Sequence, residues 1–180
     1  MHSHDLRIFT LGGAALLVLL TGGCVKHVKD VTLLDVTRVS RAYPATPELR
    51  VRFSSRSDFR ALNGKHAYLW ASLCPIKDGI IVNVRDVYLN GKVLAPGHED
   101  LPKRVADDEP PLHYSSYIDY DKVSLEVDPD VANYNLLLPP DAVNLCFRVE
   151  SAGWWRFRTN DVEIPKATIA GALAAPPVPR

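Results

Sequence analysis

The chain has 180 residues, equal numbers of basic and acidic side chains (21 each), and a hydrophobic fraction of 47%. This length suits one domain that can bury a substantial core. The balanced charge argues against general nucleic-acid binding, which requires a concentrated basic surface. The 14 prolines exceed the usual share of about 5%, and with the many Val, Leu and Tyr residues they favour strands and turns over a helical bundle.

The N-terminus carries an apolar run, Ile8–Leu20, which is followed by Thr21-Gly22-Gly23 and then Cys24. A permanent membrane-crossing helix takes about 20 apolar residues, so this run is too short for one. Small residues directly before a cysteine resemble the bacterial lipobox. The resemblance implies that residues 1–23 are a lipoprotein signal peptide and that Cys24 is the acylated lipid anchor. The alternative is that the run is an ordinary buried hydrophobic segment.

The lipobox also implies a location. An acylated Cys24 would hold the chain on the periplasmic side of a bacterial membrane, because several acyl chains together anchor a protein stably. Val25 follows the cysteine where an aspartate would favour inner-membrane retention, which indicates the outer membrane. Residues 24–30 are expected to form a tether, residues 31–175 a β-sandwich domain, and residues 176–180 a disordered proline-rich tail.

Short stretches of alternating or continuous apolar residues, bounded by Gly, Pro and Asn, predict strands along the whole domain. The clear candidates are Leu49–Phe53, with its apolar residues facing in and its arginines facing out, and then His66–Cys74, Ile80–Leu89, Lys92–Leu94, Val123–Val127, Tyr134–Leu138, Ala142–Glu150 and Trp154–Ile164. The stretch Val31–Val39 is strand-like but does not alternate cleanly. Asn90-Gly91 predicts a tight hairpin turn, because both positions of a type I′ turn need positive φ. Ala167–Ala175 can form about two helical turns. The pattern indicates an all-β fold, a sandwich of seven or eight strands with a short C-terminal helix.

Cysteine spacing fits an oxidising compartment. If Cys24 is acylated, Cys74 and Cys146 remain as an even pair in the periplasm, where disulfides persist. The alternative is two free buried thiols. Successive side chains of a strand point to opposite faces, so Leu69 and Phe147 fall on the apolar side of their predicted strands. Both cysteines fall on the less apolar side, Cys74 with Tyr68 and Trp70, and Cys146 with Arg148 and Glu150. A bridge between them is therefore expected near a sheet edge or under a loop rather than at the centre of the core.

Several exposed features are candidates for binding a protein partner. The polar segment 95–111 has the features of a long exposed loop, and such loops are often functional. Tyrosines follow this segment. Trp154 lies on the same side of its predicted strand as Arg156 and Arg158, and Trp together with Arg is typical of binding hot spots. Trp154 could instead cover the hairpin end or stack on an arginine within the domain. The partner-binding candidates are Glu99, Asp107, Asp108, Glu109, Tyr114, Tyr117, Tyr120 and Trp154.

The sequence contains no Gly-x-Ser-x-Gly, His-Glu-x-x-His or glycine-rich phosphate loop. His98-Glu99-Asp100 could ligate a cation, but neighbouring residues of this kind more often form a solvated surface. The aspartates at 119, 121, 128 and 130 lack the glycine-containing loop of a known calcium site. We therefore expect neither an enzyme nor a cofactor or metal, and a binding protein instead.

Asn144–Val149, a turn, and Thr159–Pro165 resemble the C-terminal hairpin of small periplasmic lipoproteins proposed as type VI secretion immunity proteins. The resemblance covers only the C-terminal part of the chain. It implies an immunoglobulin-like domain that binds a toxin injected into the periplasm and neutralises it by occlusion. The alternative function is that of a structural accessory lipoprotein in an envelope secretion or assembly machine. Either function requires a protein partner and membrane attachment through the lipid, and neither involves nucleic acid.

Overall fold

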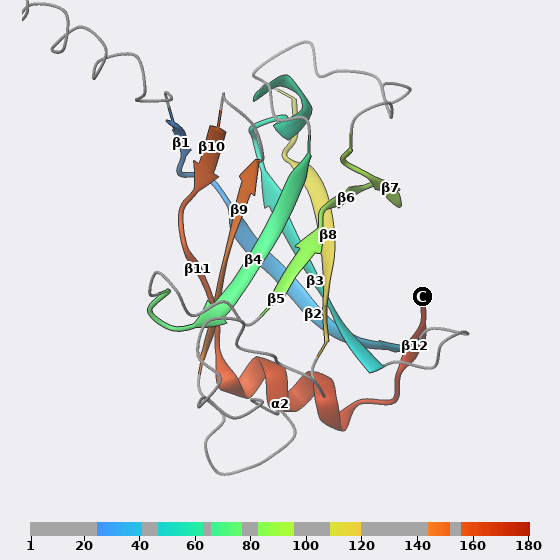
Figure 1. The fold of residues 1–180 in the computed structure, drawn as a ribbon. Helices are drawn as coiled ribbons and strands as arrows, with labels where there is room; N and C mark the ends of the chain where they lie inside the picture. The colour runs from blue at the N-terminus through green and yellow to red at the C-terminus, as the bar shows by residue number, and fades with distance from the viewer. Residues whose placement is uncertain are drawn as a thin grey trace, which may run out of the picture.

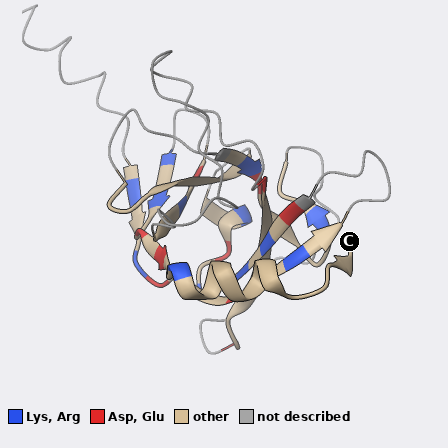
Figure 2. Cartoon of the chain, turned by 90° about the horizontal axis from the view of Figure 1, so that it is seen from below, with Lys and Arg blue, Asp and Glu red and all other residues tan. Residues whose placement is uncertain are grey.

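The computed structural model of the protein describes residues 25–40, 47–62, 66–76, 83–95, 109–119, 144–151 and 156–180. In these ranges the chain forms two β-sheets that face each other, with one α-helix across one end of the pair (Figure 1). The view from below shows this helix in front of the strands, with basic and acidic residues interspersed along them (Figure 2). The predicted all-β sandwich with a short C-terminal helix is confirmed.

One sheet, called sheet A here, has the strand order β1-β10-β9-β4-β5, with β11 also paired to β9. The other, sheet B, has the order β12-β2-β3-β8-β6-β7. The strands of sheet A are β1 (Val25–Val28), β4 (Ala67–Leu73), β5 (Asn83–Asp86), β9 (Leu145–Ser151), β10 (Arg156–Thr159) and β11 (Val162–Ile164). Those of sheet B are β2 (Thr32–Ser40), β3 (Pro47–Ser55), β6 (Tyr88–Leu89), β7 (Lys92–Val93), β8 (Leu112–Asp119) and β12 (Val178–Pro179). Among these strands, β1 with β10 and β12 with β2 pair in parallel, and the other pairings are antiparallel.

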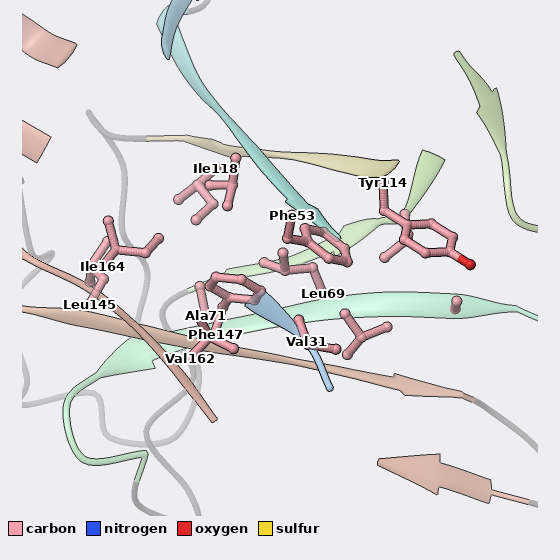
Figure 3. Packing of buried hydrophobic residues seen from close by; sticks show 14 of the residues in the cluster. Val31, Phe53, Leu69, Ala71, Tyr114, Ile118, Leu145, Phe147, Val162 and Ile164 are labelled. Carbon is pink, nitrogen blue, oxygen red and sulfur yellow. The ribbon is translucent and has the colours of Figure 1, made fainter. Parts of the chain in front are cut away.

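Strict alternation of side chains builds the core between the sheets. Leu49, Val51 and Phe53 of β3 point inward, as their predicted phase requires, and each is at most 1% exposed. The predicted inward phases of β4 and β9 are confirmed in the same way, with Leu69 and Phe147 fully buried. Figure 3 shows Phe53, Leu69 and Phe147 meeting between the two layers. The sandwich is therefore held by the apolar halves of its alternating strands.

An aromatic chain connects the two sheets through this core. The ring of Phe53 on β3 lies 5.4 Å from that of Phe147 on β9 and 5.6 Å from that of Tyr114 on β8. Phe59, in the short 3-10 helix η1 (Phe59–Leu62), stacks on Tyr114 at 4.5 Å and on Phe157 of β10 at 5.1 Å. Ring pairs at these separations add about 0.5–1.5 kcal/mol each beyond the area they bury. The aromatic chain thus holds β3, β8, η1, β9 and β10 together.

The expected strand Ile80–Leu89 differs from the one observed. The described part of it is β5 in sheet A and β6 in sheet B, separated by the fully buried Val87. Val87 donates its backbone N–H to Ala67 O and accepts from Leu94 N, so it is bonded on both sides while the chain changes sheets. The predicted turn is confirmed, because Asn90 has φ 51° and Gly91 has φ 78°.

Both ends of the described chain belong to the domain, contrary to the sequence-based expectation of a tether and a disordered tail. Residues 25–28 form strand β1 beside β10, and the Asp30 carboxylate accepts hydrogen bonds from Ser55 Oγ at 2.8 Å and Ser57 N at 3.1 Å. At the other end, Val178 and Pro179 pair with β2. These pairings join segments far apart in the sequence, so local composition could not reveal them.

Two further predictions concern the C-terminal half. The expected helix is confirmed as α2 (Lys166–Ala174), whose Ile169 and Ala172 face the core. Strand β8 occupies residues 112–119, where the sequence suggested only an aromatic patch before a strand at Val123–Val127. The strands expected at Val123–Val127 and Tyr134–Leu138 lie outside the described residues.

Candidate functional site

Six of the residues singled out from the sequence lie outside the described ranges, namely Cys24, Glu99, Asp107, Asp108, Tyr120 and Trp154. Glu109 is described and is exposed shortly before β8. Tyr114 and Tyr117 lie on opposite sides of β8, because they are an odd number of residues apart. The structure therefore separates the two described tyrosines that the sequence had grouped into one surface.

The expectation that Tyr114 contacts a partner is wrong. Its side chain is only 1% exposed and belongs to the aromatic chain in the core. Its hydroxyl donates to Ser57 O at 2.9 Å and accepts from Phe59 N at 3.3 Å. Tyr114 thus fixes the segment between β3 and η1 against β8. Strand parity with Ile118 was the sequence signal for this inward orientation.

Burial raises the pKa of the Tyr114 hydroxyl above its ordinary value of 10.0. The folded state therefore holds this proton more tightly than the unfolded chain does. This difference stabilises the folded state in full below about pH 10, and the stabilisation is lost as the pH rises further. We expect the free energy of unfolding to fall more steeply above pH 10 in the wild type than in Tyr114→Phe, by up to about 1.4 kcal/mol per pH unit. Urea unfolding at a series of pH values measures the two slopes. Equal slopes would mean that Tyr114 ionises as easily in the folded protein as in the unfolded chain.

Tyr117 points outward from sheet B and lies in a cluster with residues distant in sequence. Its ring meets that of Tyr88 edge-on, with centroids 5.4 Å apart. The guanidinium carbon of Arg180 lies 3.7 Å from the Tyr117 ring centroid, and Arg180 Nη1 lies 3.2 Å from Oε2 of the buried Glu48. Tyr117 is therefore covered in part by the C-terminal segment of its own chain.

The predicted pairing of Cys74 with Cys146 is confirmed as a disulfide with an S–S distance of 2.06 Å. It joins β9 to the residue that follows β4, and both strands belong to sheet A; Cys74 N also donates to Asn144 O. The bridge thus lies at the strand ends beside the N-terminus of α2, whose Lys166 N–H is accepted by Asn144 Oδ1. In antibody domains the conserved disulfide instead connects the two sheets. Here it stiffens one sheet.

The outer face of that stiffened sheet is the best-developed candidate site in the described part of the chain. We define the sheet A face as Tyr68, Trp70, Val84, Arg148, Glu150 and Arg158. In the register, Trp70 lies between Arg148 on β9 and Val84 on β5, and Tyr68 lies beside Glu150. These side chains alternate with the core residues of the same strands, so the aromatic chain behind them holds the face in place.

One half of the sheet A face is aromatic and apolar. Val84 is 38% exposed, and Trp70 beside it is partly buried with an indole N–H that has no hydrogen-bond partner in the part of the chain described here. The His66 ring stacks on Tyr68 at 4.2 Å, and its Nε2 lies 2.8 Å from Asp86 Oδ1. Tyr and Trp on a rigid surface supply large contact areas at a small cost in conformational entropy.

The other half is ionic. Oε1 of Glu150 lies 2.6 Å from Arg148 Nε and 2.9 Å from Arg158 Nε, although neither pair is aligned as a hydrogen bond. Two arginines therefore flank one carboxylate, and this half offers a partner charged hydrogen-bonding groups of both signs. The sequence placed Tyr68 with Trp70 and Arg148 with Glu150, but it did not show that β4 and β9 are neighbours. That missing pairing is why the site was not recognised from sequence.

The described ranges contain no helix long and apolar enough to cross a membrane. They also contain no group of three or more His, Cys, Asp or Glu side chains arranged to hold a metal ion. The residues His98, Glu99 and Asp100, and most of the aspartates weighed as calcium ligands, lie outside these ranges. Comparison with known protein families, curated proteins and solved structures gives no match.

Proposed function

We propose that this protein is a periplasmic lipoprotein, anchored by Cys24 to the outer membrane, that binds another protein. We propose further that this partner is a toxin delivered by type VI secretion, which the protein neutralises by covering its active site. The observation that supports binding of another protein is the composition of the sheet A face. It combines Trp, Tyr and Arg, the residue types enriched in binding hot spots, on a sheet stiffened by a disulfide.

Occlusion of a toxin requires no catalytic group. It requires a surface that loses little entropy on binding, and a disulfide-linked sheet backed by packed aromatic rings meets this requirement. The exposed Arg158 of the ionic half suits a carboxylate on the partner, and charge complementarity of this kind speeds association. Glu109 is exposed, and with the other acidic residues of the segment before β8 it remains a second candidate contact.

The toxin role is tested by co-expression with the toxin encoded beside the gene. The expected result is that cells survive periplasmic toxin only when this protein is present, and that the two proteins co-purify. The alternative role, a structural accessory lipoprotein, predicts instead a stoichiometric complex with components of an envelope machine. Deletion would then stop assembly of that machine without sensitising cells to the toxin. Failure of both rescue and co-purification rejects the immunity role.

The lipid anchor has its own test, because it rests on the sequence alone. Intact-mass measurement of the membrane fraction is expected to show a chain that begins at Cys24 and carries acyl groups. Cys24→Ser should leave the leader uncleaved and remove the acyl mass. Finding residue 24 unmodified, in a chain that still carries its leader, would reject the anchor while leaving the sheet A face untouched.

The sheet A face is tested with two matched arginines. Arg158 on the sheet A face and Arg52 on the outer side of sheet B have side chains 43% and 42% exposed, and each pairs with one acidic residue, Glu150 and Asp35 respectively. Arg158→Glu is expected to weaken partner binding by about 30-fold or more, the factor that corresponds to a hot-spot loss of about 2 kcal/mol. Arg52→Glu should change it by less than about twofold. Calorimetry with the purified partner measures both affinities.

Thermal unfolding of the two variants provides the control, because each substitution breaks one ion pair of an exposed arginine. Glu150 is less exposed than Asp35 (19% against 42%), so Arg158→Glu should lower stability slightly more than Arg52→Glu. If Arg52→Glu weakened binding as much as Arg158→Glu, or if only Arg52→Glu did so, the interface would not lie on the sheet A face. The binding role would then have to be assigned to sheet B or to another part of the surface.

A further inference from the structure

The cluster of side chains around Arg180 is a binding site that a segment of the same chain occupies. Glu48, Tyr117 and Tyr88 come from β3, β8 and β6, which are neighbours in sheet B. Each lies on a strand that is paired within the sheet, so the sheet and not the C-terminal segment sets the backbone positions of the three residues. The site therefore belongs to the sheet, and the tail is what fills it.

The chemistry of this site selects a guanidinium group. The Glu48 side chain is only 3% exposed, and its Oε2 lies 3.2 Å from Arg180 Nη1. The planar guanidinium lies over the Tyr117 ring at 3.7 Å, and its Nη2 donates to the Tyr88 hydroxyl at 3.3 Å. Stacking on an aromatic face together with a carboxylate and a hydroxyl acceptor suits arginine better than lysine, whose ammonium group is compact and strongly hydrated.

By contrast, the backbone of the tail is weakly held. Only Val178 and Pro179 pair with β2, opposite Val39 and Ser40, and Arg180 N donates to Ser40 O at the long distance of 3.3 Å. Val178 is 38% exposed. A two-residue parallel strand contributes little, and prolines at 176, 177 and 179 cannot donate backbone hydrogen bonds. The side chain of Arg180 therefore supplies most of the attachment.

We propose that Glu48, Tyr88 and Tyr117 form an arginine-recognition site for a protein partner. Its ligand is an extended, proline-containing peptide segment that adds to the edge of β2 in parallel and inserts one arginine between Tyr117 and Glu48. The chain's own segment 176–180 occupies this site as an exchangeable substitute. Strand addition with one side-chain anchor is an established mode of peptide recognition. The site lies in sheet B, apart from the sheet A face, and does not depend on the toxin-binding proposal.

The test measures binding of a fluorescent peptide with the sequence of residues 174–180, Ala-Ala-Pro-Pro-Val-Pro-Arg, by anisotropy. The Arg180→Ala chain has an empty guanidinium site and is expected to bind this peptide saturably, at least tenfold more tightly than the wild type does. A peptide with citrulline in place of arginine keeps the shape but loses the charge, and should bind at least tenfold more weakly. Adding Glu48→Gln to Arg180→Ala should likewise weaken binding of the arginine peptide at least tenfold.

Arg180→Lys is the control for a folding defect. It keeps a positive charge beside the buried Glu48 carboxylate and loses the stacking of a planar guanidinium on the Tyr117 ring. Its affinity for the arginine peptide should lie between those of the wild type and Arg180→Ala. The proposal is overturned if the affinity for the arginine peptide does not rise from the wild type through Arg180→Lys to Arg180→Ala. It is equally overturned if the arginine and citrulline peptides bind with the same affinity. It is also overturned if light scattering shows a wild-type dimer that Arg180→Ala dissociates, because a second copy would then be the occupant.

Discussion

Replacing Cys74 and Cys146 together by serine is expected to lower the free energy of unfolding by about 4 kcal/mol. The bridge spans 72 residues of sequence, so it removes a large loop-closure entropy from the unfolded chain. It also holds β4 beside β9 at their ends, and those two strands carry Trp70, Arg148 and Glu150 of the sheet A face. Guanidinium unfolding of the variant and the wild type measures the difference.

All chains in this comparison are expressed without the leader, residues 1–23, which Cys24→Ser would otherwise retain. A Cys24→Ser chain is then the matched control, because it removes the one other cysteine without touching the bridge. Its unfolding free energy should equal that of the wild type within about 0.5 kcal/mol. Adding a reductant to the Cys24→Ser chain should reproduce the loss seen in the double serine variant. A double variant that unfolds at the wild-type midpoint would mean that the bridge contributes nothing to stability. The stiffness attributed to sheet A would then rest on packing alone.

The second large effect is expected at Tyr114. Tyr114→Ala should lower the free energy of unfolding by about 3–5 kcal/mol, the range for removing a large aromatic side chain from a core. The reason is that it interrupts the aromatic chain between Phe53 and Phe59. Tyr114→Phe keeps the ring and removes only the hydroxyl, which leaves Ser57 O and Phe59 N without that partner. This smaller change should cost about 1–3 kcal/mol. Urea unfolding at pH 7 separates the two contributions.

Tyr117→Phe is the control for the hydroxyl, since it makes the same change three residues along β8 on the outward side. No hydrogen bond from the Tyr117 hydroxyl is present among the residues that the structure describes, so this variant should be stable to within about 0.5 kcal/mol. If Tyr114→Phe and Tyr117→Phe were equally stable, the buried hydroxyl would contribute nothing measurable. The fixed position of the segment before η1 would then depend on the stacking of Phe59.

The features recovered from sequence are those that depend on neighbouring residues. Alternation in Leu49–Phe53 and around Phe147 identified the inward side chains, because a strand has a period of two whatever its neighbours are. Asn90-Gly91 identified its turn, because few residues tolerate positive φ. The helix near the C-terminus followed from a run of good helix formers after Pro165.

The features missed from sequence depend on which strands are neighbours. Tyr114 and Tyr117 were grouped by closeness in sequence, yet the core takes one and the surface takes the other. Residues 25–28 and 178–179 were assigned to a tether and a tail because nothing local shows that β10 and β2 offer them an edge. The single strand expected through Val87 divides between the two sheets, because its hydrogen-bond partners Ala67 and Leu94 lie in other segments.

For this protein, sequence alone determined the all-β class, the inward side chains of the main strands and the identity of the disulfide partners. Periodicity, turn preference and an even pair of cysteines are local or countable properties. Only the tertiary structure decided that Trp70 and Arg148 share a face, and that Arg180 lies between Tyr117 and Glu48. Those contacts arise when the hydrogen-bonding edges of strands from distant parts of the chain pair with one another, and no short stretch of sequence carries that information.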